Sequence, residues 1–179
     1  AIKSELEDLC MKYRFPEEYE EIRRKIDATK SEREEYIERF IRPIREVLDR
    51  NKFQYEIAAR VKSIYSIWNK MQRKGIPFEE VYDLFAIRIV FKALPFPSEK
   101  TQCWQVYSCV TDIYTPKPDR LRDWISIPKS NGYEALHSTV MGPEGTWVEV
   151  QVRTERMDDI AERGFAAHWK YKHASITQE

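Results

Sequence analysis

The 179-residue sequence predicts an α+β fold, with a mixed β-sheet flanked by helices. Residues 84–91 are a near-continuous run of apolar, branched and aromatic residues, which is typical of a buried central strand. Residues 147–153 alternate apolar and polar side chains, as a strand with one buried face does. Segments with helical periodicity surround these strands. The predicted order is helix, strand, helix, strand, helix, two strands and helix.

The first 50 residues are predicted to be helical. Pro16 is suited to the first turn of a helix, and the glutamates that follow it lie where the helix dipole favours anions. Further along, apolar residues recur at helical spacing: Ile37, Phe40, Ile41, Ile44 and Leu48. We therefore divide the chain into a helical connector, residues 1–50, and a mixed-sheet domain, residues 51–175.

The middle of the chain supplies the elements on either side of the central strand. Residues 52–58 predict a first strand. Residues 61–73 predict an amphipathic helix, because their apolar side chains fall on one side at about 100° per residue. After the central strand, residues 95–100 predict a loop and residues 102–114 a helix. A basic segment of irregular structure follows, at residues 116–129.

The last two strands are predicted to form a hairpin around a turn at residues 142–145. If the loop has these four residues, Ser138 pairs opposite Glu149, and His137 points to the other face of the sheet. His137 would then need a bulge or a different register to reach the same site as Glu149. A helical stretch from Thr154 completes the predicted fold.

Composition excludes several classes of protein. Hydrophobic residues make up 42% of the chain, and 30 basic residues balance 30 acidic ones, so intrinsic disorder is not expected. No apolar run approaches a membrane span, so no membrane partner is expected. The three cysteines lack the paired spacing of a zinc site or a disulfide framework. A reducing, cytoplasmic location is the corresponding expectation.

Two carboxylates are the strongest candidates for chemistry. Asp83 comes just before the central strand, and Glu149 lies on the polar face of the last strand with Gln151 and Arg153. Mg²⁺ prefers oxygen ligands, commonly one or two carboxylates together with substrate phosphates. The sequence therefore predicts a magnesium site at Asp83 and Glu149. A helix cap, or an ion pair with Arg88, is the alternative for Asp83.

Basic and aromatic side chains near these carboxylates are suited to a nucleotide. There is no P-loop and no GxGxxG motif, so side chains would have to hold the phosphates. Tyr133 follows a glycine in a basic segment and has a ring that could stack on a base, although a core position is the alternative. The candidate phosphate-binding cations are Arg60, Lys62, Lys70, Arg73 and Lys129.

Five motifs, in order, resemble those of the RelA/SpoT-homologue alarmone synthetases. They are RVKSIYSIWNKM at 60–71, VYDLFAIRIVF at 81–91, RLRDWISIPKSNGYEALH at 120–137, VEVQVRT at 148–154 and AERGFAAHWKYK at 161–172. Residues 5–40 also resemble the helical connector that precedes the synthetase domain in long, bifunctional members. The resemblance thus implies a nucleotidyltransferase-like synthetase domain at residues 51–175.

The resemblance implies transfer of the β,γ-pyrophosphate of ATP to the 3′-hydroxyl of GDP or GTP, giving ppGpp or pppGpp in the stringent response. Asp83 would hold Mg²⁺ or Mn²⁺, and Glu149 would share the metal or act as the base, supported by Gln151 and Arg153. The ATP-binding residues implied are Arg60, Lys62, Lys70 and Arg88. The guanine-nucleotide-binding residues implied are Lys129, Asn131, Tyr133, His137 and Arg153.

The resemblance also sets expectations about partners and leaves one preference open. The hydrolase and regulatory domains of the long members are missing from this sequence and would be its partners; ribosome contact would come only through them. The basic motif at residues 120–123 bears on the choice between GDP and GTP without deciding it. The alternative function is a catalytically silent module that binds guanine nucleotide or alarmone. RNA binding through residues 60–74 is disfavoured by the neutral net charge.

Overall fold

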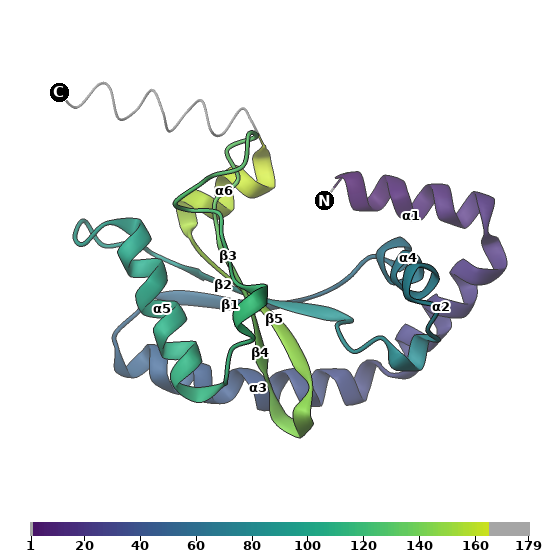
Figure 1. Ribbon diagram of the computed structural model, residues 1–179, viewed down its shortest axis with the longest axis horizontal. Helices are drawn as coiled ribbons and strands as arrows, with labels where there is room; N and C mark the ends of the chain where they lie inside the picture. The colour runs from purple at the N-terminus through teal and green to yellow at the C-terminus, as the bar shows by residue number, and fades with distance from the viewer. Residues whose placement is uncertain (1, 165–179) are drawn as a thin grey trace.

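A five-stranded mixed sheet lies at the centre of the protein, in a computed structural model that describes residues 2–164 (Figure 1). The strand order is β1-β2-β5-β4-β3; β2 and β5 are parallel and the other neighbours antiparallel. The mixed sheet predicted from the sequence is thereby confirmed. The strands are β1 (Tyr55–Val61), β2 (Phe85–Phe91), β3 (Arg122–Asp123), β4 (Leu136–Met141) and β5 (Trp147–Thr154).

Six α-helices and three short 3₁₀ helices complete the described residues. The α-helices are α1 (Ile2–Arg14), α2 (Pro16–Ala28), α3 (Lys30–Arg50), α4 (Ile64–Lys74), α5 (Glu99–Ile113) and α6 (Glu155–Arg163). The 3₁₀ helices are η1 (Phe78–Glu80), η2 (Pro118–Arg120) and η3 (Pro143–Gly145). The last motif beyond residue 164, and the predicted end of the domain at residue 175, lie outside the described residues. In residues 2–164 no helix is both long and apolar enough to span a bilayer.

The main hydrophobic core lies between one face of the sheet and the helices α3 and α5 (Figure 1). Alternate residues of β2 and β5 supply the sheet side, because a strand presents every second side chain to the same face. The valine face predicted for the last strand is buried here. The fully buried contributors include Phe40, Ile44, Ile87, Ile89, Val106, Val150 and Val152.

A second, smaller core lies beside the sheet and contains no strand residue. It joins α1, α2, α4 and η1 through the buried side chains of Met11, Ile22, Ile67 and Phe78, with Val81 following η1. Figure 1 shows these helices grouped at one side of the sheet, away from α5. The described residues therefore form two apolar clusters, and the partly buried side chain of Leu84 packs against both.

Helix α3 belongs to the sheet's core although it lies in the predicted connector. The Phe40 ring stacks on Tyr114 with centroids 4.6 Å apart, and the Tyr114 hydroxyl donates a hydrogen bond of 2.9 Å to the Phe40 carbonyl. At Gly142 a Cβ atom would come within 2.6 Å of the Tyr36 hydroxyl, so α3 also fits closely against the β4–β5 hairpin. Residues 2–50 are almost entirely helical, as predicted, but of their three helices only α1 and α2 pack apart from the sheet.

Two predicted helix starts are wrong by about three residues. The first strand continues to Val61, because Arg60 and Val61 pair with Ala86 and Phe85, and α4 begins only after Ser63. Lys62 therefore precedes α4 and does not lie on its basic face. Helix α5 begins at Glu99 instead of residue 102, because the Ser98 hydroxyl accepts a hydrogen bond from the Thr101 N–H and caps the helix earlier.

Replacing Phe40 by alanine tests the role of α3 in the core. The substitution leaves a cavity among fully buried side chains and should lower the free energy of unfolding by about 3–5 kcal/mol, measured by urea denaturation. Arg42→Ala, at an exposed position of the same helix, is the matched control and should change it by less than about 0.5 kcal/mol. Equal effects of the two substitutions would contradict the packing described here.

Candidate active site

The polar side chains of β5 lie on the face of the sheet opposite α3 and α5. In the observed register Glu149 pairs with Thr139 of β4, and Gln151 pairs with His137. On the other side Gln151 pairs with Arg88 of β2. Paired residues share a face, so Gln151 stands between an imidazole and a guanidinium.

The predicted register of the hairpin is wrong by one residue. The loop has five residues, 142–146, and is closed by a hydrogen bond of 2.8 Å from the Gly142 N–H to the Thr146 carbonyl. One added loop residue moves every side chain of one strand to the other face. His137 therefore lies on the same face as Glu149 without any bulge.

Asp83 is held by two lysines from different parts of the chain. It lies in the loop between η1 and β2; Lys62 Nζ donates a hydrogen bond of 2.9 Å to its Oδ2, and Lys70 Nζ donates one to its Oδ1. Partial burial alone would raise the pKa of Asp83, but the hydrogen bonds from Lys70 and Lys62 prevail and lower it to about 2. Asp83 is therefore an anion at neutral pH, and its partners are lysines and not Arg88.

Lys62 also brings the two candidate carboxylates together. Its ammonium nitrogen lies 2.9 Å from Asp83 Oδ2 and 3.5 Å from Glu149 Oε2. One cation thus faces both carboxylates, which come from loop and strand positions 66 residues apart. The predicted proximity of Asp83 and Glu149 is what the structure shows.

Glu149 is oriented by neutral neighbours on its other side. Gln151 Nε2 donates a hydrogen bond of 2.9 Å to Glu149 Oε1, and His137 Nδ1 lies 4.0 Å from the same oxygen. Burial lowers the pKa of His137 to about 4 despite the opposing charge of Glu149, so the imidazole is neutral at pH 7. The Tyr133 hydroxyl and His137 Nε2 are hydrogen-bonded at 2.7 Å, which fixes the ring.

Helix α6 supplies anions for two arginines of this face, Arg88 and Arg153. Arg88 Nη1 donates a hydrogen bond of 2.9 Å to Glu162 and lies 3.7 Å from Asp158. Arg153 is only 1% exposed, and its Nε faces Asp158 Oδ1 at 3.0 Å. Asp158 and Glu162 are four residues apart and so share a face of α6. That spacing was visible in the sequence, but nothing there indicated which arginines it would meet.

The loop from Lys129 to Tyr133 is shaped by its own polar groups. Asn131 Oδ1 accepts a hydrogen bond of 3.1 Å from the Tyr133 N–H, and Gly132 has a positive φ of 81°. The Lys129 ammonium lies 4.7 Å from the centre of the Trp124 ring and 5.2 Å from that of Tyr133. The Asn131 side chain therefore stabilises the turn, and the Lys129 ammonium packs beside the Tyr133 ring.

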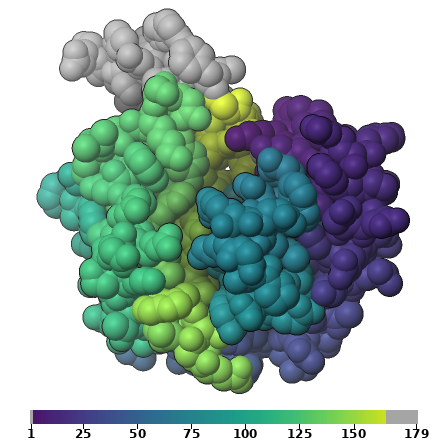
Figure 2. Space-filling model, turned by 45° about the vertical axis from the view of Figure 1, so that its right-hand side comes forward, coloured from purple at the N-terminus to yellow at the C-terminus, as the bar shows by residue number. Residues whose placement is uncertain are grey.

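Two cavities open on this face of the sheet. The first, of about 230 Å³, contains both carboxylates; Figure 2 shows a groove between the segment that contains α4 and the segment that follows α5, with β5 between them. Four cations line it, and three of them were not assigned from the sequence. These four are Lys70, Lys74, Lys117 and Arg120. Trp147 lines it as well, with Lys117 Nζ 5.3 Å from its ring centre.

The second cavity, of about 190 Å³, combines residues that the sequence analysis assigned to two nucleotides. Arg60 and Arg88, expected at ATP, line it together with Tyr133 and Arg153, expected at the guanine nucleotide. The other two residues expected at ATP, Lys62 and Lys70, lie with Asp83. The two cavities therefore do not correspond to the ATP-binding group and the guanine-nucleotide-binding group predicted from the sequence.

The carboxylates suit a metal that is also held by substrate. Within residues 2–164 no group of three or more His, Cys, Asp or Glu side chains is arranged to hold an ion. A pair of carboxylates fits Mg²⁺, which commonly takes one or two of them and completes its shell with phosphate oxygens and water. The site does not fit a metal that needs a complete protein cage.

The fold and this charged face define the class of protein. It is an α+β domain whose mixed sheet is flanked by helices, with a carboxylate pair beside clustered lysines and arginines on one face. The family described as "Region found in RelA / SpoT proteins" matches residues 59–176, well over half of the chain. The protein belongs to the RelA/SpoT family.

Curated relatives are similar along almost the whole chain. The chain is 40% identical over 173 residues to the guanosine-3′,5′-bis(diphosphate) 3′-pyrophosphohydrolase of Aquifex aeolicus, covering 96% of the chain and 24% of that protein. It is 40% identical over 174 residues to the GTP pyrophosphokinase of Escherichia coli, covering 97% of the chain and 23% of that protein. The chain therefore spans about a quarter of the length of these relatives.

Solved structures agree with the fold. Small alarmone synthetase 1 from Bacillus subtilis, bound to its product pppGpp, superposes with a TM-score of 0.56 at 23% identity, over 86% of this chain and 83% of that one. Small alarmone synthetase 2 from the same organism gives 0.52 at 24% identity, over 86% and 78%. At these identities the likeness establishes the fold of the sheet and its helices.

The buried imidazole of His137 predicts a pH-dependent stability. Its pKa is about 4 in the folded protein, against an ordinary value of 6.5. The stability associated with the neutral, buried imidazole is therefore fully present above pH 6.5 and is lost as the pH falls from 6.5 towards 4. Lowering the pH from 7 to 5 should therefore reduce the free energy of unfolding by roughly 1–2 kcal/mol through this group. Urea denaturation at both pH values should show a smaller loss for His137→Gln than for the wild type. Equal losses would contradict the burial of a neutral imidazole.

Proposed function

We propose that this domain transfers the β,γ-pyrophosphate of ATP to the 3′-hydroxyl of GDP or GTP, forming ppGpp or pppGpp in the stringent response. The observation that carries the proposal is the convergence of Asp83 and Glu149 on one ammonium, at 2.9 Å and 3.5 Å, inside a cleft lined by further cations. Membership of the RelA/SpoT family and the name of the E. coli relative, GTP pyrophosphokinase, support this reaction.

The donor nucleotide would be held by side chains. Phosphoryl-type transfer depends on positioning and on charge neutralisation more than on covalent chemistry by the protein. Lys62 and Lys70 already bind the anionic oxygens of Asp83, so the phosphates of ATP would compete with that carboxylate for the same ammonium groups. Lys74, Lys117 and Arg120 extend the positive surface of the cleft, while Arg60 and Arg88 are proposed to contact the rest of ATP.

Asp83 and Glu149 are proposed to hold Mg²⁺, or Mn²⁺ in its place. The ion would neutralise charge on the polyphosphate of the donor. We also propose that Glu149 accepts the proton of the acceptor hydroxyl. The hydrogen bond of 2.9 Å from Gln151 Nε2 to Glu149 Oε1 supports this role, because it orients the carboxylate. His137 is neutral beside it and so would not neutralise the carboxylate.

The acceptor nucleotide is proposed to meet the loop before β4. The Tyr133 ring is suited to stack on guanine, with Lys129, Asn131 and His137 around it. Arg153 supports this loop from beneath, because its guanidinium lies 5.8 Å from the centre of the Tyr133 ring and is tied to Asp158. Arg153 would therefore act mainly by supporting Tyr133.

The remaining proposals concern the longer relatives. Because the chain spans about a quarter of their length, we propose hydrolase and regulatory domains as partners of this domain in a longer protein. Ribosome contact would come through those domains, and the cytoplasm is the proposed location. The choice between GDP and GTP stays open in this proposal.

Product analysis tests the proposed reaction. The domain is incubated with γ-³²P-labelled ATP, with GDP or GTP, and with Mg²⁺ or Mn²⁺, and the products are separated by thin-layer chromatography. Labelled ppGpp or pppGpp is the expected result. Binding of guanine nucleotide without any product, under every metal condition, would overturn the synthetase proposal in favour of the silent binding module.

Substitutions of Asp83 and Glu149 should affect product formation to different degrees. Asp83→Ala should abolish product formation, since it removes a proposed metal ligand and leaves two lysines without their partner. Glu149→Gln should lower kcat by roughly 10²–10⁴-fold, the usual contribution of a positioned base. The control is Glu155→Gln, at an exposed position of α6. A Glu149→Gln enzyme with wild-type kcat would show that the base is elsewhere.

The Tyr133 ring should contribute directly to acceptor binding. Tyr133→Ala should weaken guanine-nucleotide binding by about 1–3 kcal/mol in titration calorimetry, because a stacking surface is lost. Tyr133→Phe keeps the ring and removes only the hydroxyl that meets His137, so its affinity should stay close to that of the wild type. If the two variants bind equally weakly, the hydroxyl and not the ring is responsible.

A further inference from the structure

Helix α4, which carries Lys70, is not supported by the sheet. Its buried residue Ile67 packs into the second core with Met11 of α1, Ile22 of α2 and Phe78 of η1. The rings of Phe15 and Trp68 stack with centroids 5.0 Å apart and join α4 to the junction of α1 and α2. Figure 1 shows α4 beside these two helices. The position of α4 beside the sheet is therefore set largely by α1 and α2.

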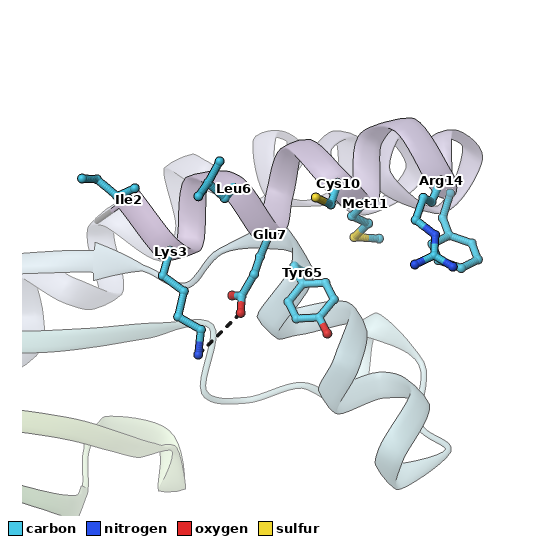
Figure 3. Close-up of a pocket in the computed structure, with 9 residues that line it drawn as sticks. Ile2, Lys3, Leu6, Glu7, Cys10, Met11, Arg14 and Tyr65 are labelled. Atoms are coloured by element: carbon cyan, nitrogen blue, oxygen red, sulfur yellow. Dashed lines mark ion pairs between the residues drawn. The ribbon is translucent and has the colours of Figure 1, made fainter.

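One carboxylate of α1 binds the first turn of α4. The Ile64 N–H donates a hydrogen bond of 3.3 Å to Asp8 Oδ2, and the Tyr65 N–H donates one of 2.8 Å to Asp8 Oδ1. Figure 3 draws the neighbouring pocket residues of α1 and shows Tyr65 of α4 below that helix, between Glu7 and Met11 in this view. The first N–H groups of a helix have no partner within it, and a negative charge there is favoured by the helix dipole.

Asp8 and Ser63 together satisfy the start of α4. Ser63 Oγ accepts a hydrogen bond of 3.2 Å from the Ser66 N–H, the group that Asp8 does not reach. The two lysines that bind Asp83 lie on either side of this capped turn: Lys62 just before it and Lys70 farther along the same helix. A shift of the helix start by about 1 Å would stretch the 2.9 Å hydrogen bond between Lys62 and Asp83 beyond its useful range.

We propose that Asp8 is a positioning residue for the phosphate-binding lysines: it fixes the start of α4 and thereby holds Lys70 over Asp83. Asp8 lies outside the family match at residues 59–176 and more than 50 residues from the helix that it caps. Its side-chain hydrogen bonds within residues 2–164 go to the Ile64 and Tyr65 N–H groups, which are not assigned to the proposed site. The predicted consequence for ATP rests on the proposed function, whereas the consequence for α4 does not.

The experiment compares Asp8→Ala and Asp8→Asn with the wild-type chain. Amide hydrogen exchange of Ile64 and Tyr65, followed by NMR without substrate, should accelerate about tenfold in Asp8→Ala, the usual effect of losing a side-chain cap. The affinity for the non-hydrolysable analogue α,β-methylene-ATP should fall about three- to tenfold. Asp8→Asn keeps one acceptor oxygen but no charge. Its amide exchange rates and its affinity for the analogue should lie between those of the wild type and those of Asp8→Ala.

Kinetics separate positioning from general weakening of the fold. In Asp8→Ala the KM for ATP should rise about three- to tenfold, with kcat and the KM for GDP within about twofold, because the affected contact serves ATP binding. Glu5→Gln removes a charge from an exposed position of α1, and Val106→Ala opens a cavity in the main core. Both controls should leave the KM for ATP unchanged, although Val106→Ala lowers the melting temperature.

Distinct outcomes overturn the two proposals. Unchanged amide exchange at Ile64 and Tyr65 would overturn the role of Asp8, as would faster exchange with unchanged affinity for the ATP analogue. An equal rise in KM for Val106→Ala would also overturn it, since any loss of stability would then suffice. A wild-type chain that makes no product would overturn the proposed function alone, because exchange and analogue binding still test Asp8.

Discussion

The ion pairs of Asp83 with Lys62 and Lys70 are the interaction on which the rest of the site depends. The carboxylate lies in a loop that leads into β2, Lys62 follows β1, and Lys70 belongs to α4. All three side chains are less than one-third exposed, so the attraction is screened less than at a fully solvated surface. This cluster ties the helical group to the sheet beside Leu84, which packs against both apolar cores.

The site lies at the junction of two differently supported parts. Strand pairing fixes Glu149, Gln151, His137 and Arg88 on one face of the sheet, and the main core behind them is closed by α3 and α5. The second core fixes α4 and its lysine. Glu149 therefore reaches the cleft from the sheet and Lys70 reaches it from α4, while Lys117 and Arg120 belong to the segment beside β4. A movement of α1 and α2 relative to the sheet would change the positions of the lysine side chains and leave the β5 residues in place.

The sequence predicted the sheet well because alternation and apolar runs report directly on burial. The polar face of β5 and the central position of residues 84–91 followed from local pattern alone. The face of His137 did not, since it depends on one extra residue in the 142–146 loop. The end of β1 was missed because pairing with β2 overrode the helical pattern. The partners of Asp83 and the Asp8 cap are long-range contacts, for which a single sequence carries no periodic signal.

The most direct test of this account is the pKa of Asp83, measured by ¹³C NMR titration of its carboxyl carbon. Two lysine hydrogen bonds that outweigh partial burial require a pKa of about 2 in the wild-type chain, and Lys70→Met should move it towards the ordinary value of 3.8. A wild-type pKa at or above 3.8, or one that does not respond to Lys70→Met, would contradict the central place given to this cluster.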